Sequence, residues 1–213
     1  MRTSSPGFAS AVRHVVFAMA LLFCGTGLAA AATPAEALIS GNINTGLEIL
    51  NDRQLDTEQR RVQFENFLLG VTDLKRVATF TLGPYGAKAS PEDRDGFAIA
   101  FQNYAVAVYQ SYFAKYAGQS LTVTGSRQVA PQDDIVSTVL IDPTDRGGRP
   151  LEVDFRVRSN AAKPVIVDFA VAGVWLAPAE RDEFAAYLGQ NGGDVRKLIA
   201  YLDQLRGRIA GGG

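Results

Sequence analysis

The chain has 213 residues, of which 47% are hydrophobic and 20% are charged, and its formal net charge is −1. This composition is typical of a folded protein. It excludes a strongly basic nucleic-acid-binding chain, because there is no surplus of lysine and arginine to neutralise phosphates.

The first 32 residues have the pattern of a secretory signal peptide. Arg2 and Arg13 precede an apolar run at 15–23, and mainly small residues occupy 27–32. We expect this leader to be cleaved at the end of the small residues. Residues 33–208 would then form a single domain, and the Gly-rich residues 209–213 would be a disordered tail.

Loss of the leader would remove the chain's only cysteine, Cys24, and its only histidine, His14. The mature chain would then have no disulfide, no thiol or imidazole catalyst, and no metal site built on His or Cys. No glycine-rich nucleotide-binding motif is present either. The adjacent acids Asp133 and Asp134 suggest a solvated turn, because neighbouring side chains point apart. We therefore expect neither an enzyme nor a protein with a cofactor or metal.

The first part of the mature chain predicts helices. A capping box at 33–36 starts the first helix, and a second follows Asp56. A third begins at Asp73 and ends at Gly83, which is followed by proline. All three have the apolar spacing of amphipathic helices.

A fourth helix carries the stretch GFAIAFQNYAVAVYQSYFA, which has no charged residue. Ser90 caps this helix, which we expect to run to about Tyr116. The stretch is about long enough to cross a bilayer, but interior amides such as Gln102 and Asn103 argue against a membrane span. Its broad apolar arc fits either a protein core or the wall of an apolar cavity, and periodicity does not separate the two.

From Leu121 onwards, the apolar period changes from helical to two. Further strands are predicted at 135–141, 151–158 and 164–176, joined by turns short enough for hairpins. Two helices follow, one from Pro178 and one with apolar positions between 195 and 205. The predicted fold class is α+β, with N-terminal helices and a C-terminal helix pair on a curved antiparallel sheet of about four strands.

The chain resembles the MlaC, or toluene-tolerance, family of periplasmic lipid-binding proteins. The resemblance covers nearly all of the mature chain, in the blocks FLLGVTDLKRVATFTLGPY, SPEDRDGFAIAFQNYAVAVYQSYFAKYAGQSLTVTG, VDFRVR and VDFAVAGVWLAPAERDEFAAYLGQNGGDVRKLIAYL. Three positions depart from the family pattern. Gly86 replaces a tryptophan, Ala172 replaces an acid, and Trp175 replaces a small serine.

The resemblance implies a soluble periplasmic carrier that shuttles phospholipid between the outer and inner membranes. Its implied partners are an inner-membrane ABC transporter complex with a periplasmic MCE-type subunit and an outer-membrane lipoprotein complex. One alternative cargo is a hopanoid or another polycyclic lipid, because Trp175 would offer a wide aromatic contact. Another alternative is a filled-core adaptor that binds only protein.

In such a carrier, the acyl chains would lie in an apolar cavity between helices and sheet. The helical wall of this cavity would be formed by Phe80, Leu82, Phe97, Phe101, Tyr104, Val108 and Tyr112. The sheet would contribute Val139, Phe155, Val157, Phe169, Val171 and Trp175. The sheet residues depend on register, because a shift of one residue moves every side chain of a strand to the other face.

Overall fold

The computed structural model describes residues 31–113, 116–145, 150–159 and 164–211. Most of the predicted signal peptide lies outside these residues, as do the last two residues of the predicted tail. Residues 209–211 are described, and they belong to the last helix rather than to a disordered tail.

The helices begin where their caps were predicted. Helix α1 (Pro34–Asn51) starts at Thr33, whose hydroxyl accepts from the backbone N–H of Glu36, while Thr33 N–H donates to the Glu36 carboxylate. Helix α2 (Thr57–Val71) has the same reciprocal box between Asp56 and Gln59. Each box satisfies backbone donors that have no partner inside the helix.

Helix α3 (Leu74–Lys88) does not end at Gly83 as predicted. It bends there, because Gly83 has φ 55° and ψ −137°, and it continues through Pro84. Helix α4 (Pro91–Phe113) begins after Ser90, whose hydroxyl accepts from Asp93 N–H at 3.0 Å. Its predicted extension towards Tyr116 crosses residues 114–115, which lie outside the described chain.

Five strands form one antiparallel sheet in the order β1-β2-β3-β4-β5. Their bounds are β1 (Ser120–Ala130), β2 (Asp133–Ile141), β3 (Leu151–Ser159), β4 (Pro164–Val171) and β5 (Val174–Trp175). The predicted last strand is therefore two strands. Ala172 and Gly173 both have positive φ, 50° and 82°, and they form a two-residue turn between β4 and β5.

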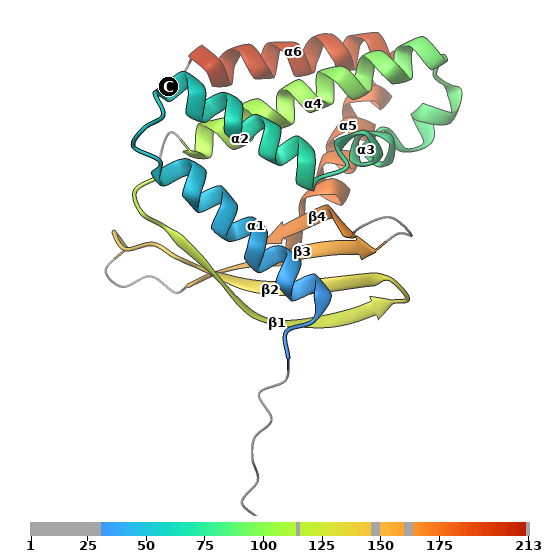
Figure 1. Cartoon of the computed structure of the whole chain (residues 1–213). Helices are drawn as coiled ribbons and strands as arrows, with labels where there is room; N and C mark the ends of the chain where they lie inside the picture. The colour runs from blue at the N-terminus through green and yellow to red at the C-terminus, as the bar shows by residue number, and fades with distance from the viewer. Residues whose placement is uncertain (1–30, 114–115, 146–149, 160–163, 212–213) are drawn as a thin grey trace, which may run out of the picture. The chain divides into compact units, whose positions relative to one another are not determined.

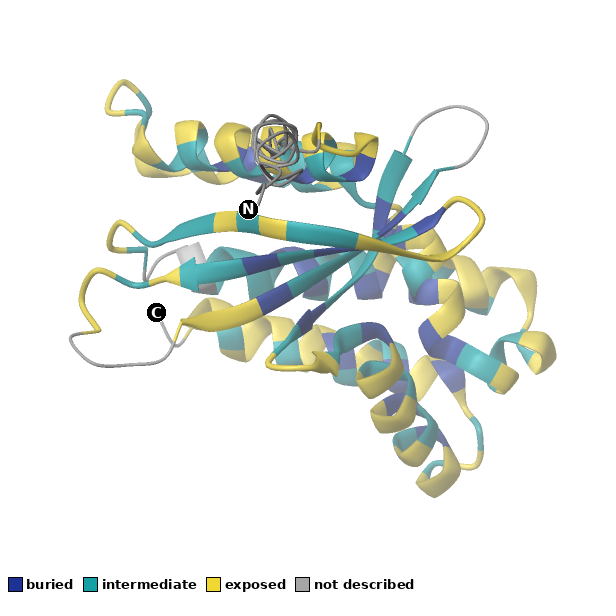
Figure 2. Cartoon of the chain, turned by 90° about the horizontal axis from the view of Figure 1, so that it is seen from below, coloured by how far each residue is buried: buried dark blue, intermediate teal, exposed yellow. Residues whose placement is uncertain are grey.

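The helices lie over one face of the sheet (Figure 1). Helix α1 packs on β1 and β2, whereas α3 and α5 (Leu176–Gln190) contact β4. Seen from below, the strands lie in front of the helices (Figure 2). The α+β class and the meander topology predicted from the sequence are confirmed.

Two buried clusters hold the domain together. One lies among α3, α4, α5 and α6 (Val195–Gly211) and includes Phe97, Phe184 and Leu198. The other joins α1 to the sheet through residues such as Ile39 and Val136. Within the described chain, no helix, α4 included, is long and apolar enough to cross a membrane.

Candidate functional site

The first half of the α4 aromatic stripe is part of the helical core. Phe97 is 1% exposed and Phe101 is 5% exposed. Both rings meet the Phe184 ring of α5 edge-on, with centroids 5.9 and 6.3 Å away. Leu82 of α3 is buried in the same cluster. These three predicted cavity residues therefore contact other helices within the helical core.

Tyr104, one turn further along α4, lies beside a partly buried acid. It packs on the helical core, and its side chain lies close to Glu180 of α5. Burial raises the pKa of Glu180 to about 7, and the nearby Glu183 adds to this effect. Burial and the same two acids also raise the pKa of Tyr104. Sequence reasoning missed Glu180, because an acid in the first turns of a helix is usually solvated.

The second half of α4 reaches the sheet through an aromatic row. The ring of Tyr109 lies 5.8 Å from that of Phe169 on β4, and Phe169 lies 6.3 Å from Phe155 on β3. All three residues are partly exposed. Phe155 and Phe169 were predicted to line the cavity, whereas Tyr109 was not among the predicted residues. These rings connect the two buried clusters.

The pairing register defines which side chains face the helices. Phe155 pairs with both Val136 and Phe169, and Val171 pairs with Val153. Paired residues project from the same face of a sheet. Val157, two residues from Phe155, lies on this inner face and is fully buried against α1. Predicted residues Phe155, Val157, Phe169 and Val171 therefore share the inner face.

Val139 and Trp175 lie on the opposite face of the sheet. Val139 pairs with Glu152, and Trp175 pairs with Ala170. Both are thus out of phase with Phe155 and Phe169, so the register does not group them with the inner-face residues that were predicted to line the cavity. Strand β2 has apolar residues at both parities, so its own pattern could not identify the inner side.

The other predicted helical residues have different environments. Phe80 is 42% exposed on α3, and the Arg181 guanidinium lies over its ring at 5.1 Å. Val108 is partly buried on α4. Tyr112 belongs to α4, but its side chain is outside the described part of the structure. Phe80 therefore forms a partly exposed cation–π contact with α5.

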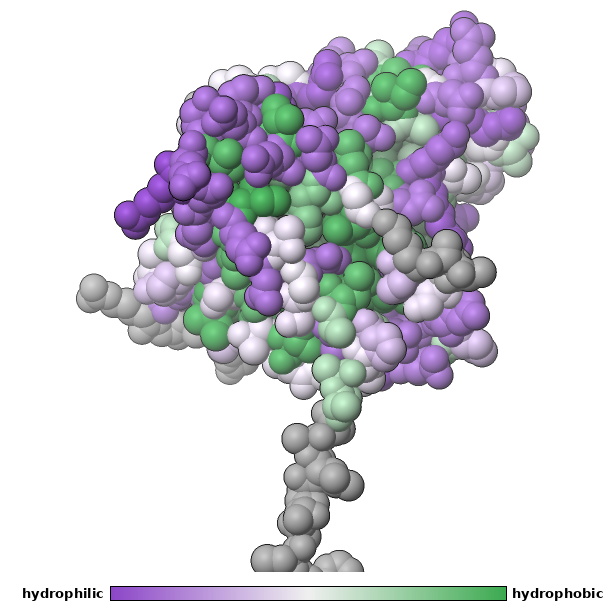
Figure 3. Space-filling model, in the orientation of Figure 1, coloured by the Kyte–Doolittle hydropathy of each residue, from purple (hydrophilic) through white to green (hydrophobic). Residues whose placement is uncertain are grey.

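Figure 3 shows hydrophobic side chains gathered between the helices above and the sheet below. The aromatic row also lies between a helix, α4, and the sheet, and we call this region the apolar seam. A half-exposed apolar band of this kind is a common feature of surfaces that bind apolar ligands.

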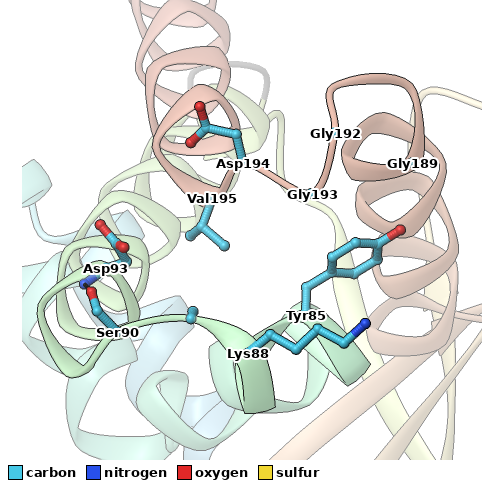
Figure 4. A pocket seen from close by; sticks show the side chains of 10 residues that line it. Tyr85, Lys88, Ser90, Asp93, Gly189, Gly192, Gly193, Asp194 and Val195 are labelled. Carbon is cyan, nitrogen blue, oxygen red and sulfur yellow. Dashed lines mark hydrogen bonds between the residues drawn. The ribbon is translucent and has the colours of Figure 1, made fainter.

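A separate polar pocket of about 500 Å³ lies among the ends of four helices (Figure 4). Its lining includes Tyr85 and Lys88 from the end of α3, Asp93 from α4, and Asp194 before α6. It contains none of the predicted lipid-binding residues. In the described ranges, no three acidic, histidine or cysteine side chains are grouped to hold a metal ion.

The two adjacent acids of β2 occupy different environments. Asp133 is 3% exposed, and its carboxylate contacts Arg156 and Arg158 at 2.7 and 3.0 Å. Hydrogen bonds from Arg156 lower the pKa of Asp133. Asp134 pairs with Val157 on the other face. The expectation that the two side chains point apart is correct, but Asp133 forms an ion pair rather than a solvated turn.

A helical layer over one face of a five-stranded antiparallel meander defines the class of fold as α+β. Comparison with known proteins agrees with this class. The MlaC protein family model matches residues 41–204, and the chain belongs to that family. The family predicted from the sequence is thereby confirmed.

A solved structure supports the same fold. It is a phospholipid-binding protein from Ralstonia solanacearum, determined in complex with a phospholipid. The likeness has a TM-score of 0.72 and 22% sequence identity, and it covers 84% of this chain and 99% of that chain. At this identity, the likeness establishes the shared fold.

Proposed function

We propose that this protein is a soluble periplasmic carrier that shuttles phospholipid between the two membranes of the cell envelope. The row formed by Tyr109, Phe169 and Phe155 is the observation that carries this proposal. It presents partly exposed aromatic surface between the two buried clusters. Membership of the MlaC family and the phospholipid bound to the structural relative support the same function.

The acyl chains would lie along the inner face of the sheet. We assign their contacts to Val108, Tyr109, Phe155, Phe169 and Val171. Each methylene removed from water contributes about 0.8 kcal/mol. Release of two acyl chains into water would therefore be very slow, so transfer requires docking to a partner.

The proposed partners are an inner-membrane ABC transporter complex with an MCE-type subunit and an outer-membrane lipoprotein complex. The signal-peptide pattern of residues 1–32 supports export to the compartment that contains both. Differences in lipid affinity between carrier and partners would determine the direction of transfer.

Native mass spectrometry of the protein purified from the periplasm tests this function. We expect each protein molecule to carry one phospholipid, which has two acyl chains. Protein that is isolated without lipid, and that takes up none from phospholipid vesicles, would contradict the proposal. A triterpenoid mass would instead support a polycyclic cargo, although Trp175, the residue that suggested it, lies on the outer face of the sheet.

A further inference from the structure

Asn42 lies on the face of α1 that packs on the sheet. At 100° per residue, the buried residues Ala35, Ile39 and Gly46 all lie within about 60° of it. It is a polar side chain in the middle of an otherwise apolar helix face. This position calls for a hydrogen-bond partner.

The neighbours of Asn42 place it at the junction of α1, α2 and the sheet. Ile39 packs in one cluster with Val136, and Phe155 packs against this cluster. On the following turn, Gly46 lies against α2, where an added Cβ would be 3.5 Å from the Phe67 ring. Figure 1 shows α1 between the sheet and α2. Asn42 therefore faces the side of the sheet that carries the aromatic row.

The side-chain nitrogen of Asn42 is buried and has no hydrogen-bond partner in the described part of the protein. A buried amide donor without a partner destabilises a fold, so native proteins rarely keep one. Three other buried side-chain atoms share this property, on Arg60, Gln110 and Glu180. Asn42 is distinguished from them by lying on the face of α1 that packs on the inner side of the sheet.

The other three atoms lie in different surroundings. Arg60 already donates through Nη2 to two backbone carbonyls, those of Asp52 and Leu55. Glu180 lies beside Tyr104 in the helical layer. Gln110 projects about 100° away from the side chain of Tyr109, which contacts the sheet.

We propose that Asn42 donates a hydrogen bond to an ester carbonyl oxygen of the bound phospholipid. This inference rests on the proposed function. Helix α1 contains no lysine or arginine, and a buried phosphate would need such a charge beside it. An ester carbonyl is a neutral acceptor at the upper end of an acyl chain, so it matches a neutral amide donor in an apolar wall.

The test compares a diester phosphatidylglycerol with its diether analogue, which has the same headgroup and chain length but no ester carbonyl. Both lipids compete with a fluorescent phospholipid for the purified protein. We expect the wild type to prefer the diester by about threefold to tenfold, the value of one neutral hydrogen bond. Asn42→Leu should bind the two lipids equally, at the affinity of the wild type for the diether.

Asn44→Leu, on the exposed side of α1, is the matched control and should keep the preference. Asn42→Ala provides a second variant if the leucine prevents folding. Equal binding of both lipids by the wild type, or a preserved preference in both Asn42 variants, would overturn the inference and leave the carrier function intact. Failure of the wild type to bind either lipid would overturn both.

Discussion

At the scale of single residues, Glu180 is the group whose environment departs most from its sequence context. Its carboxylate is partly buried between α4 and α5, and burial raises its pKa to about 7. The unfolded chain would ionise this acid near pH 4.5. Between these two values the folded state binds more protons, so the free energy of unfolding falls as pH rises. Above about pH 7, the full penalty of a partly buried charge is present.

We expect Glu180→Gln to stabilise the protein at pH 8 and to have little effect at pH 4. After allowance for solvent screening, the gain should be about 1–2 kcal/mol. Urea unfolding at the two pH values measures it. Glu48→Gln, an exposed acid of α1, is the control and should show no such difference. An equal effect of Glu180→Gln at both pH values would show that the charge is not responsible.

At the scale of secondary-structure elements, α5 is capped by a residue from the sheet. Trp175 occupies the N-cap position but gives no side-chain hydrogen bond. The carboxylate of Asp168 on β4 instead accepts from Ala177 N–H at 3.0 Å and from Phe169 N–H at 2.9 Å. One side chain therefore supplies the cap of α5 and links that helix to the sheet.

Asp168→Ala should lower the free energy of unfolding by about 1–2 kcal/mol, because it removes the cap of α5. Asp168→Asn keeps an acceptor oxygen and should lose less. Chemical denaturation of the three proteins measures both effects. Equal losses in the two variants would show that charge, rather than the capping oxygen, is what α5 requires.

The bend in α3 depends on Gly83 in a similar way. Its φ of 55° and ψ of −137° are strained for other residues, and an added Cβ would lie 3.0 Å from Nε of Arg181. We expect Gly83→Ala to cost about 1–3 kcal/mol. Gly41→Ala in α1 meets no atom within 4 Å and should be neutral or stabilising. Thermal unfolding compares them, and a neutral Gly83→Ala would contradict the prediction.

At the scale of the whole molecule, the aromatic rings of the helical core and those of the apolar seam should have different roles. Phe184 is fully buried among helices, whereas Phe169 is partly exposed between β4 and α4. The free energy of unfolding should depend mainly on Phe184, and lipid binding on Phe169.

Phe184→Ala should therefore lower stability by about 3–5 kcal/mol. Phe169→Ala should cost less than about 2 kcal/mol but should weaken phospholipid retention. Unfolding curves and lipid content after extraction measure the two properties on each variant. A Phe169→Ala protein that retains lipid as well as the wild type would contradict the assignment of Phe169 to the lipid site, and absence of lipid from both proteins would support the filled-core alternative.

The sequence by itself determined the class of fold, the starts of the first four helices and the family. Caps such as the Thr33–Glu36 box are local, and alternating residues in β3 define a half-buried strand without reference to distant chain. The tertiary structure alone decided which apolar residues face one another. Phe101 and Tyr109 belong to one continuous helix, yet one contacts Phe184 and the other Phe169.

The physical reason is that burial depends on neighbours that are remote in the chain. Val139 and Val157 are both apolar strand residues, but the pairing register places them on opposite faces of the sheet. Val139 pairs with Glu152 on the outer face, whereas Val157 pairs with Asp134 on the inner face. The raised pKa of Glu180 has the same origin, because it results from helix packing and not from the adjacent sequence. Periodicity predicts that a face is buried, and only the fold decides what covers it.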